Sequence, residues 1–505
     1  MAEQMLAADG RPLKASLNRA LRRQKLRALA LIAPLLIFIL VSFVMPIADM
    51  LFRSVENEIV SDTLPRTTDA LSSWDEASDT APDEAVFEAL YTDMVLANEY
   101  KTHTRLGSRL NYEMTGISSL FRKSGRGVER FETDVYTEAF QNADPAYADP
   151  AQWNRWMDDD AVRDALPATA DAYDAWARMI RQEEGDDPAE EEPWDFVYTA
   201  LYQDARSGAA LPIPVDLSGI EPVSIKAQFE DIDDDWVDPA VWRTIKTYSP
   251  RYTDGYFLNS VDLMRGAEGI EARPENEQIY ITLFIRTMIM SLSIMGMCVL
   301  LGYPIAWLLA NLPDRTANLL MILVLLPFWT SLLVRTSAWK VLLQQEGVIN
   351  DILVWIGLVG DNDRLQMINN QAGTIIAMTH ILLPFMILPL YSVLKTIPPS
   401  YLRAAKSLGA TNWTAFWRVY FPQSVPGIGA GCILVFILAI GYYITPELVG
   451  GTKGVFISNR IAYHISSSLN WGLAAALGTI LLAVVLILYW VYDKIVGIDN
   501  VKLGG

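Results

Sequence analysis

Six stretches of this chain are long, apolar and free of charged residues, and no other feature constrains the fold as strongly. They are Ala28–Ala48, Thr287–Pro313, Thr316–Val334, Leu365–Leu394, Val419–Pro446 and Ile461–Tyr492. A helix of about 20 apolar residues crosses the hydrocarbon of a bilayer. Backbone polar groups find no water there, so such a segment must be helical. The sequence therefore predicts an all-α membrane protein with six transmembrane helices, near 28–51, 281–311, 317–338, 373–394, 424–446 and 470–493.

Charged residues are concentrated between the first two of these helices. Residues 56–280 hold 48 of the 59 acidic residues and 19 of the 40 basic ones, so this block has a net charge of −29. It also contains seven tryptophans, which favour a folded core over disorder. Apolar spacing predicts helices at Glu84–Glu99, Arg105–Phe121, Ala168–Arg181, Trp194–Arg206 and Asp238–Thr247. We therefore expect a large, mostly helical insertion, with Ser54–Asp83 and Gln182–Glu192 as linkers or loops.

The distribution of Lys and Arg predicts the orientation. Seven basic residues lie in the first 27 positions, and the loop after the fourth helix contains Lys395, Arg403, Lys406 and Arg418 without an acidic residue. Short basic loops stay in the cytoplasm. With six crossings, both termini are predicted to be cytoplasmic and the acidic block to lie outside; in the bacterial inner membrane implied by the resemblance given below, the outside is the periplasm. The long first apolar run lacks a cleavage site and predicts a signal anchor rather than a cleaved signal peptide.

The chain is accordingly divided into five parts. They are a cytoplasmic basic tail (1–27), transmembrane helix 1 (28–52), an acidic periplasmic domain (53–279), transmembrane helices 2–6 with the loop at 395–423 (280–496), and a cytoplasmic tail (497–505).

The loop at 395–423 carries the most informative local pattern. Pro398 and Pro399 end the preceding helix, and Ser400 is suited to cap a new one. Gly409 is suited to end that helix with a left-handed turn. A second short helix is predicted at Asn412–Tyr420, before Pro422. From the residues alone, this helix pair either docks into a groove of a partner protein or rests on lipid headgroups.

The same loop resembles the signature of permease subunits of binding-protein-dependent ABC importers. Ala404, Ala405, Gly409, Val419 and Pro422 stand in register with that signature, with Phe421 in its last apolar place. Arg403 departs from it, because the family often has Glu there. The resemblance implies a type I importer permease fold in which this loop couples to the ATPase. The candidate coupling residues are Tyr401, Leu402, Arg403, Ala404, Ala405, Leu408, Gly409, Ala410 and Pro422.

Further motifs resemble the spermidine/putrescine-type branch of this family. They are Gly302–Ala306, Leu326–Ser331, Arg335–Trp339, Glu346–Asn350 and Thr445–Gly451. The resemblance implies import of polyamines or a similar small organic solute. It also implies two ATPase subunits, a second and non-identical permease subunit, and a periplasmic solute-binding protein as partners. Tyr303, Trp329 and Glu447 are the candidate residues of the solute path, and the identity of the solute stays open.

The sequence predicts no catalytic or metal site of its own. It contains no Gly-Lys dipeptide, so it has no Walker A loop to hold ATP phosphates. ATP and Mg²⁺ are therefore expected on the partner ATPase, with no cofactor in this chain. Asp158–Asp160 and Asp231–Asp235 lack the Gly and distal Glu of a calcium-binding loop.

Two questions stay open from the sequence. The acidic domain can dock the solute-binding protein, concentrate cations by its field, or serve as a solvated acidic cap. The rival to the importer class is a non-ABC membrane sensor or scaffold protein with a large outer interaction domain, because six helices and an acidic domain fit that class equally well.

Overall fold

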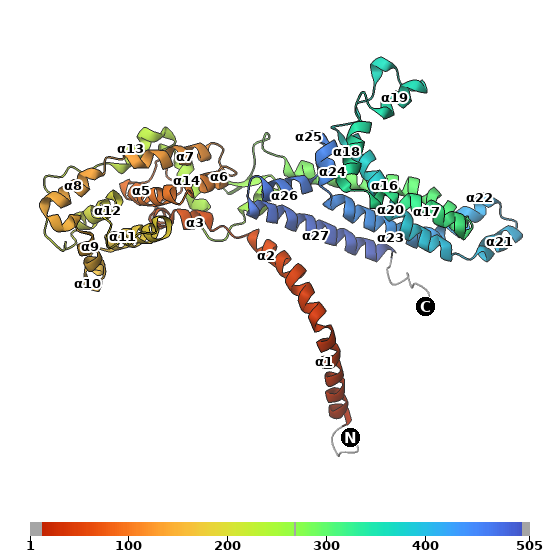
Figure 1. Cartoon of the computed structure of the whole chain (residues 1–505), viewed down its shortest axis with the longest axis horizontal. Coiled ribbons are helices and arrows are strands. Elements are labelled where there is room, and N and C mark those ends of the chain that lie inside the picture. Colours follow the sequence, from red (N-terminus) through yellow and green to blue (C-terminus); the bar gives the residue numbers. More distant parts are fainter. Residues whose placement is uncertain (1–12, 267–268, 497–505) are drawn as a thin grey trace. The chain divides into compact units, whose positions relative to one another are not determined.

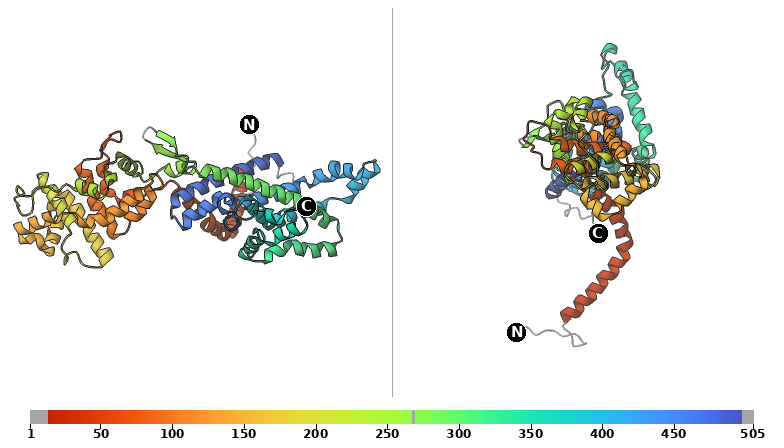
Figure 2. Two further views of the ribbon diagram at one scale, coloured as in Figure 1. Left: turned by 90° about the horizontal axis from the view of Figure 1, so that it is seen from above. Right: turned by 90° about the vertical axis from the view of Figure 1, so that its left-hand side faces the viewer.

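The computed structural model describes residues 13–266 and 269–496, so residues 1–12 and 497–505 of the predicted cytoplasmic tails lie outside the described residues. The chain forms two compact units. One consists of Met1–Val55 and Ile279–Gly505 and is called here the apolar unit; the other, Glu56–Gln278, is called the acidic unit. Both are built almost entirely from helices, as Figures 1 and 2 show.

The apolar unit contains helices of very different lengths. In chain order they are α1 (Leu13–Ile39), a π-helical turn at Leu40–Val44, α2 (Met45–Arg53), α16 (Tyr280–Asn311), α17 (Asp314–Trp329), α18 (Leu332–Leu342), α19 (Val348–Trp355), a 3-10 turn at Asp361–Asp363, α20 (Gln371–Thr396), α21 (Pro399–Ser407), α22 (Asn412–Ala415), a π-helical turn at Phe416–Tyr420, α23 (Phe421–Gly441), α24 (Ile444–Val449), α25 (Gly451–Gly454), α26 (Ile457–Ser466) and α27 (Trp471–Val496).

Five continuous helices of the described chain are long and apolar enough to cross a membrane. They are Gln24–Arg53, Tyr280–Asn311, Gln371–Thr396, Asn412–Gly441 and Trp471–Lys494. The predicted third helix at 317–338 is wrong as a single straight helix, because α17 and α18 meet at an angle of 95°. Thr330 and Ser331 between them adopt extended backbone angles, and Pro327 in the last turn of α17 removes one helical donor. Counting this bent pair as one crossing gives six.

The fifth predicted helix also differs from the structure. The short helix expected at Asn412–Tyr420 is not separate, since Asn412–Gly441 forms one continuous helical stretch. The π-helical turn at Phe416–Tyr420 comes directly before the first turn of α23, which contains Pro422. Proline lacks a backbone donor, and an irregular turn of this kind is a common way to carry a helix past such a site. The continuous helix then ends at Gly441, whereas the sequence predicted an end near residue 446.

Close packing of α16, α20 and α23 forms the centre of the apolar unit. A Cβ atom placed on Gly427 would lie 2.9 Å from Val393 Cβ, and one on Gly431 would lie 2.5 Å from Met386 Sδ. The two glycines therefore let α23 approach α20 closely, as expected for small residues four positions apart in membrane helices. Gly427 and Gly431 thus form a close-packing face on α23.

The acidic unit is an assembly of short helices. They are α3 (Ile59–Thr63), α4 (Pro65–Leu71), α5 (Glu84–Glu99), α6 (His103–Leu110), α7 (Ile117–Gly127), α8 (Asp134–Ala143), α9 (Pro150–Met157), α10 (Asp160–Ala165), α11 (Pro167–Met179), α12 (Asp195–Arg206), α13 (Ile225–Ile232), α14 (Pro239–Thr247) and α15 (Gly255–Ser260), with 3-10 turns at Val128–Arg130, Pro145–Ala148 and Asp234–Val237 and a π-helical turn at Ile180–Glu184. In the described part of the chain the only sheet is the antiparallel pair β1 (Leu263–Gly266) and β2 (Gly269–Ala272), drawn as arrows in Figure 2.

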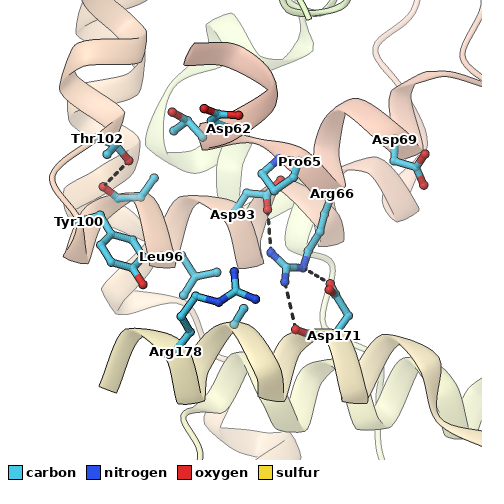
Figure 3. A pocket seen from close by; sticks show the side chains of 13 residues that line it. Asp62, Pro65, Arg66, Asp69, Asp93, Leu96, Tyr100, Thr102, Asp171 and Arg178 are labelled. Carbon is cyan, nitrogen blue, oxygen red and sulfur yellow. Dashed lines mark hydrogen bonds and ion pairs between the residues drawn. The ribbon is translucent and has the colours of Figure 1, made fainter. Parts of the chain in front are cut away.

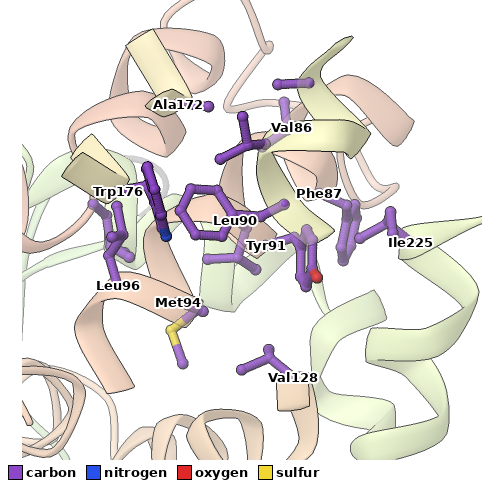
Figure 4. Close-up of a cluster of buried hydrophobic side chains, with 14 of the residues drawn as sticks. Val86, Phe87, Leu90, Tyr91, Met94, Leu96, Val128, Ala172, Trp176 and Ile225 are labelled. Atoms are coloured by element: carbon purple, nitrogen blue, oxygen red, sulfur yellow. The ribbon is translucent and has the colours of Figure 1, made fainter. Parts of the chain in front are cut away.

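An aromatic core holds this unit together, which confirms the core predicted from its tryptophans. Trp153, Trp176, Trp236 and Trp242 are fully buried. Figure 4 shows part of this core, where Phe87, Leu90 and Trp176 come from two different helices. The helices predicted at Glu84–Glu99, Trp194–Arg206 and Asp238–Thr247 agree with α5, α12 and α14 to within one residue.

Two local predictions for the acidic unit are wrong. Arg105–Phe121 is not one helix, because the chain turns between α6 and α7 through Gly116 at a φ of +102°. Ser54–Asp83 is not simply a linker, since it contains α3 and α4, and their neighbourhood buries Val60, Leu64 and Leu71 completely. Short helices with few apolar residues have weak periodicity, so the sequence alone does not reveal them.

Part of the acidity of this unit is used to start helices and turns. Asp144, Asp149, Asp159, Asp233 and Asp238 each accept a hydrogen bond from the backbone N–H two residues further on. A carboxylate in this position satisfies a donor that the first turn leaves unpaired. These aspartates therefore have a structural role in addition to their contribution to net charge.

A buried ionic cluster joins the two ends of the acidic unit. Arg273 donates to Glu113 Oε2 at 2.8 Å, and Arg109 donates to Glu113 Oε1 at 2.7 Å and to the Tyr256 hydroxyl at 2.9 Å. Tyr256 in turn donates to Asn57 Oδ1 at 3.3 Å. We call Arg109, Glu113, Arg273, Tyr256 and Asn57 the clamp. It ties the segment that enters the unit to the segment that leaves it, through α6 and α15.

We expect Glu113→Gln to destabilise the acidic unit by about 3 kcal/mol, because it leaves two buried guanidinium groups without their shared carboxylate. The matched control is Asp254→Asn, which removes an exposed ion pair with Arg265 and should cost less than about 1 kcal/mol. Urea titration of the full chain, with limited proteolysis between 56 and 278 as the readout, measures both. Equal losses would contradict the role of the clamp.

Candidate functional site

The first candidate site is the turn from α20 into α21. Lys395, near the end of α20, pairs with Asp314 at the start of α17 at 2.8 Å. Pro399 occupies the first turn of α21, where its missing donor and fixed φ are favourable. The N-cap is Pro398, without a side-chain hydrogen bond, and Ser400 lies inside the helix. The expected capping by Ser400 is therefore wrong, because the N-cap is Pro398, two residues earlier.

The end of α21 has the geometry predicted for Gly409. This glycine has a φ of +90° and donates to Lys406 O at 3.0 Å. Ala410 donates to Ala405 O at 3.1 Å. These two hydrogen bonds form a Schellman motif, in which a left-handed residue lets the chain leave the helix with its carbonyls satisfied. The motif fixes the direction in which the chain continues toward α22.

The apolar side chains of α21 and its end are divided between two environments. Leu402 packs against the cluster that contains Leu394 and Tyr420, and Ala405 is half-buried. Tyr401 and Leu408 point away from the bundle, with 52% and 90% of their surfaces exposed. Arg403, Ala404 and Lys406 are exposed as well. The helix is thus held on one side and presents apolar and basic groups on the other.

An aromatic support lies behind α21. Phe416 packs against Tyr303 with ring centroids 6.0 Å apart, and the Tyr303 hydroxyl shares a hydrogen bond of 3.1 Å with Ser424. Tyr420 is buried in the same cluster. Figure 1 shows α21 and α22 at one end of the bundle, opposite α24 and α26. Trp413 of α22 and Trp417 of the π-helical turn that follows it are also exposed. They lie a few residues after Leu408 in the chain.

The three candidate solute-path residues lie at different levels of the apolar unit. Tyr303 lies beside the first turns of α23, whereas Glu447 is in α24, beyond its other end. The 21 residues of α23 separate these levels by about 30 Å. Trp329, at the end of α17 where the bent pair breaks, is 71% exposed. Tyr303 and Glu447 are therefore too far apart to line one small pocket.

Glu447 is held by neighbours that the sequence did not identify. Asn459 donates to Glu447 Oε2 at 2.6 Å and also to Tyr443 O at 2.9 Å. Thr445 shares a hydrogen bond with Thr336 of α18 at 3.2 Å. Asn459 lies twelve residues after Glu447, near the start of α26, and the turn between α24 and α26 brings it to the carboxylate. This exposed carboxylate therefore has a defined position at its end of the bundle.

The acidic unit contains an open cavity of about 570 Å³ between α4, α5 and α11 (Figure 3). Arg66 lies in its wall, with Nε 2.5 Å from Asp171 and Nη1 3.1 Å from Asp93. Burial raises the pKa of Asp93 to about 6, although hydrogen bonds from Thr67 and Arg66 oppose the rise. Exposed Asp62, Asp69 and Arg178 complete the charged lining. Within the described chain, no group of three or more His, Cys, Asp or Glu is placed to hold a metal ion.

The apolar unit thus combines a bundle of membrane-length helices with a short, exposed helix at one end. Residues 302–496 match the family described as binding-protein-dependent transport system inner membrane component. The chain is 36% identical over 217 residues to the spermidine/putrescine transport system permease protein PotB of Salmonella typhimurium (strain SL1344), covering 42% of this chain and 75% of that protein. Identity to PotB of Escherichia coli (strain K12) is also 36% over 217 residues, covering 42% and 78%.

The chain therefore belongs to the family of inner-membrane permease components of binding-protein-dependent ABC importers, in its polyamine branch. The matched region contains α21 and every candidate coupling and solute-path residue. A solved structure of a bacterial alginate ABC transporter, in complex with a periplasmic protein bound to alginate pentasaccharide, is 20% identical and has a TM-score of 0.36. That likeness covers 45% of this chain and 81% of the other, and its score is too low to refine the assignment.

We expect Gly409→Ala to weaken the end of α21 by about 1–2 kcal/mol, because a Cβ is strained in the left-handed conformation even where space is open. Amide hydrogen exchange of residues 399–410 in the full chain should then rise several-fold. Gly296→Ala is the matched control, since Gly296 also has open space around its Cβ position but lies inside α16 with ordinary helical angles. Unchanged exchange in the Gly409 variant would contradict the structural role of the turn.

Proposed function

We propose that this chain is the membrane-spanning subunit of an ATP-driven importer and couples to a separate ATPase through α21. The observation that carries this proposal is the exposed outer face of α21, fixed in place by the Gly409 turn in a chain that belongs to the importer permease family. The substrate class supported by the relatives is polyamines or a similar small organic solute.

Coupling through α21 follows from its two faces. Tyr401 and Leu408 are suited to enter a cleft on the ATPase subunit, because exposed apolar side chains of this size gain most from burial in a partner. Arg403 and Lys406 are suited to acidic groups beside that cleft. Leu402 and the Tyr303–Ser424 contact then transmit a displacement of α21 to α16 and α23. ATP and Mg²⁺ bind to the partner, and this chain supplies no cofactor.

Alternating access needs only that the ATPase and the solute-binding protein prefer different states of the bundle. In this topology the bent pair α17–α18 provides the third of six crossings, both termini are cytoplasmic, and the acidic unit is periplasmic. The partners are two ATPase subunits, a second permease subunit that differs from this one, and a periplasmic solute-binding protein. The acidic unit docks the binding protein in this scheme; a solvated acidic cap is the alternative role.

Co-purification tests the assembly. The full chain is extracted under mild conditions from cells that express the complete importer, and bound proteins are identified by mass spectrometry. We expect an ATPase, a second permease and a binding protein with the wild type and with Leu358→Asp. With Leu408→Asp we expect at least tenfold less ATPase. Leu358 is the matched control because it is also a strongly exposed leucine, at 71% against 90%.

Two results would count against the proposal. If Leu408→Asp retains the ATPase in full, the coupling role of α21 is wrong. If the wild type brings no ATPase under several mild conditions, the sensor or scaffold class replaces the importer.

Glu447 is proposed to attract a cationic solute at the outer end of the path. We expect Glu447→Gln to lower spermidine uptake several-fold in cells at low external concentration, while Gln keeps an oxygen that accepts from Asn459. Glu346→Gln, at another exposed glutamate of the apolar unit, is the control. An unchanged uptake rate in the Glu447 variant removes this residue from the path.

A further inference from the structure

Two segments of the acidic unit share a sequence pattern and the same buried hydrogen bonds. Residues 62–74 read DTLPRTTDALSSW, and residues 164–176 read DALPATADAYDAW. In the first, the backbone N–H and the hydroxyl of Thr67 both donate to Asp93, each at 2.8 Å. In the second, the same two groups of Thr169 donate to Asp204, at 2.7 and 2.6 Å. Asp93 and Asp204 each end a similar stretch, ALYTD at 89–93 and ALYQD at 200–204.

The backbone repeats as well. Leu64 and Leu166, which precede the prolines of α4 and α11, are both fully buried. Both have backbone angles outside the regular regions, with φ and ψ of −124° and 53° for Leu64 and −125° and 64° for Leu166. Matching residues in matching, uncommon conformations are evidence that α4–α5 and α11–α12 are equivalent helix pairs.

A second pattern follows each helix pair along the chain. Residues 140–153 read FQNADPAYADPAQW, and residues 229–242 read FEDIDDDWVDPAVW. In the first, Trp153 Nε1 donates to Tyr147 O at 2.7 Å; in the second, Trp242 Nε1 donates to Trp236 O at 2.8 Å. The aspartates at 149 and 238 cap the helices that follow, by the same bond to the residue two positions on. We call α8, the 3-10 turn at Pro145–Ala148 and α9 the first arm, and α13, the turn at Asp234–Val237 and α14 the second arm.

Each arm packs on the helix pair of the other copy. Phe87 of α5 contacts Phe229 and Trp242 of the second arm, with ring centroids 5.9 and 4.8 Å apart. Tyr198 of α12 contacts Trp153 of the first arm, with centroids 5.3 Å apart. Tyr198 and Phe87 hold equivalent positions, six residues before Asp204 and Asp93. Tyr136 of the first arm also stacks on Tyr202 of α12 at 4.3 Å.

We propose that the acidic unit is an internal duplication with exchanged arms: residues 62–157 and 164–246 are two copies of one helical unit, and each copy completes the helix pair of the other. Exchange of an identical element between two copies is a known route to a stable dimer, and here one chain would contain both partners. The two copies then depend on each other for their cores and should form one rigid body rather than two independent domains.

The two copies differ in a few elements, and these elements are additions to the framework that the copies share. Only the first copy has α6 and α7 between its helix pair and its arm, and α6 carries Arg109 of the clamp. The second copy has no equivalent helix among the described residues 207–223. Arg66 stands where the second copy has Ala168, and it bridges Asp93 of one copy to Asp171 of the other. The connection to the rest of the chain and the charged link between the copies are thus additions to a shared framework.

An arm graft tests the duplication in the full chain. Residues 135–156 are replaced by the sequence of residues 224–245, which has the same length, and the control carries a scrambled version of that sequence. We expect the graft to keep a protease-resistant acidic unit, with a cleavage rate within about threefold of the wild type, while the scrambled control is cleaved at least tenfold faster. Cleavage of the graft as fast as the scrambled control would overturn the equivalence of the arms.

Hydrogen exchange of point variants tests the exchange of arms without a large perturbation. Phe229→Leu in the second arm should raise amide exchange more in α5 than in α12, by about threefold or more. Phe140→Leu, at the equivalent position of the first arm, should raise it more in α12 than in α5. Each variant is the control for the other. Equal rises in both helices, or a larger rise in the variant's own copy, would overturn the exchange.

Discussion

The lack of water in the bilayer core is the constraint on which the apolar unit depends. It forces each crossing segment to satisfy its own backbone, so the long apolar stretches become helices. Because of the same constraint, a break in a membrane helix leaves backbone groups that other parts of the protein must satisfy. The chain breaks its helices at Thr330–Ser331, where α17 bends into α18, and after Gly441, before α24. Helices approach each other closely where their residues are small, and Gly427 and Gly431 allow α23 to lie close to α20.

Coupling of α21 to the bundle depends on a few contacts at one end of these helices. The Gly409 turn fixes where the chain goes after α21, and Leu402 and the Tyr303–Ser424 pair connect α21 to α16 and α23. Because α21 is short and held on one side only, its outer face is free to meet a partner. Force applied there reaches packed helices rather than a loop, which is the property that a coupling element needs.

In the acidic unit, many aspartates that contribute to the net charge also have a structural role. Asp93 and Asp204 are buried acceptors for threonine groups, and Asp149 and Asp238 start helices. Their positions recur because the framework recurs, so a part of the charge of −29 follows from how this unit folds. The clamp and Arg66, which do not recur, carry the connections that are particular to this chain.

The sequence by itself determined which segments are helical and apolar, the family, the position of the Gly409 turn, and the aromatic core of the acidic unit, because each depends on spacing or composition along the chain. The tertiary structure decided that Tyr401 and Leu408 face outward while Leu402 faces inward, that Asn459 holds Glu447, and that α3 and α4 belong to the core. The duplication can be read in the sequence, but only the hydrogen bonds of Thr67 and Thr169 indicate which residues to compare. The orientation of side chains on α21 and the burial of α3 and α4 depend on contacts between different helices, and the local sequence pattern does not specify those contacts.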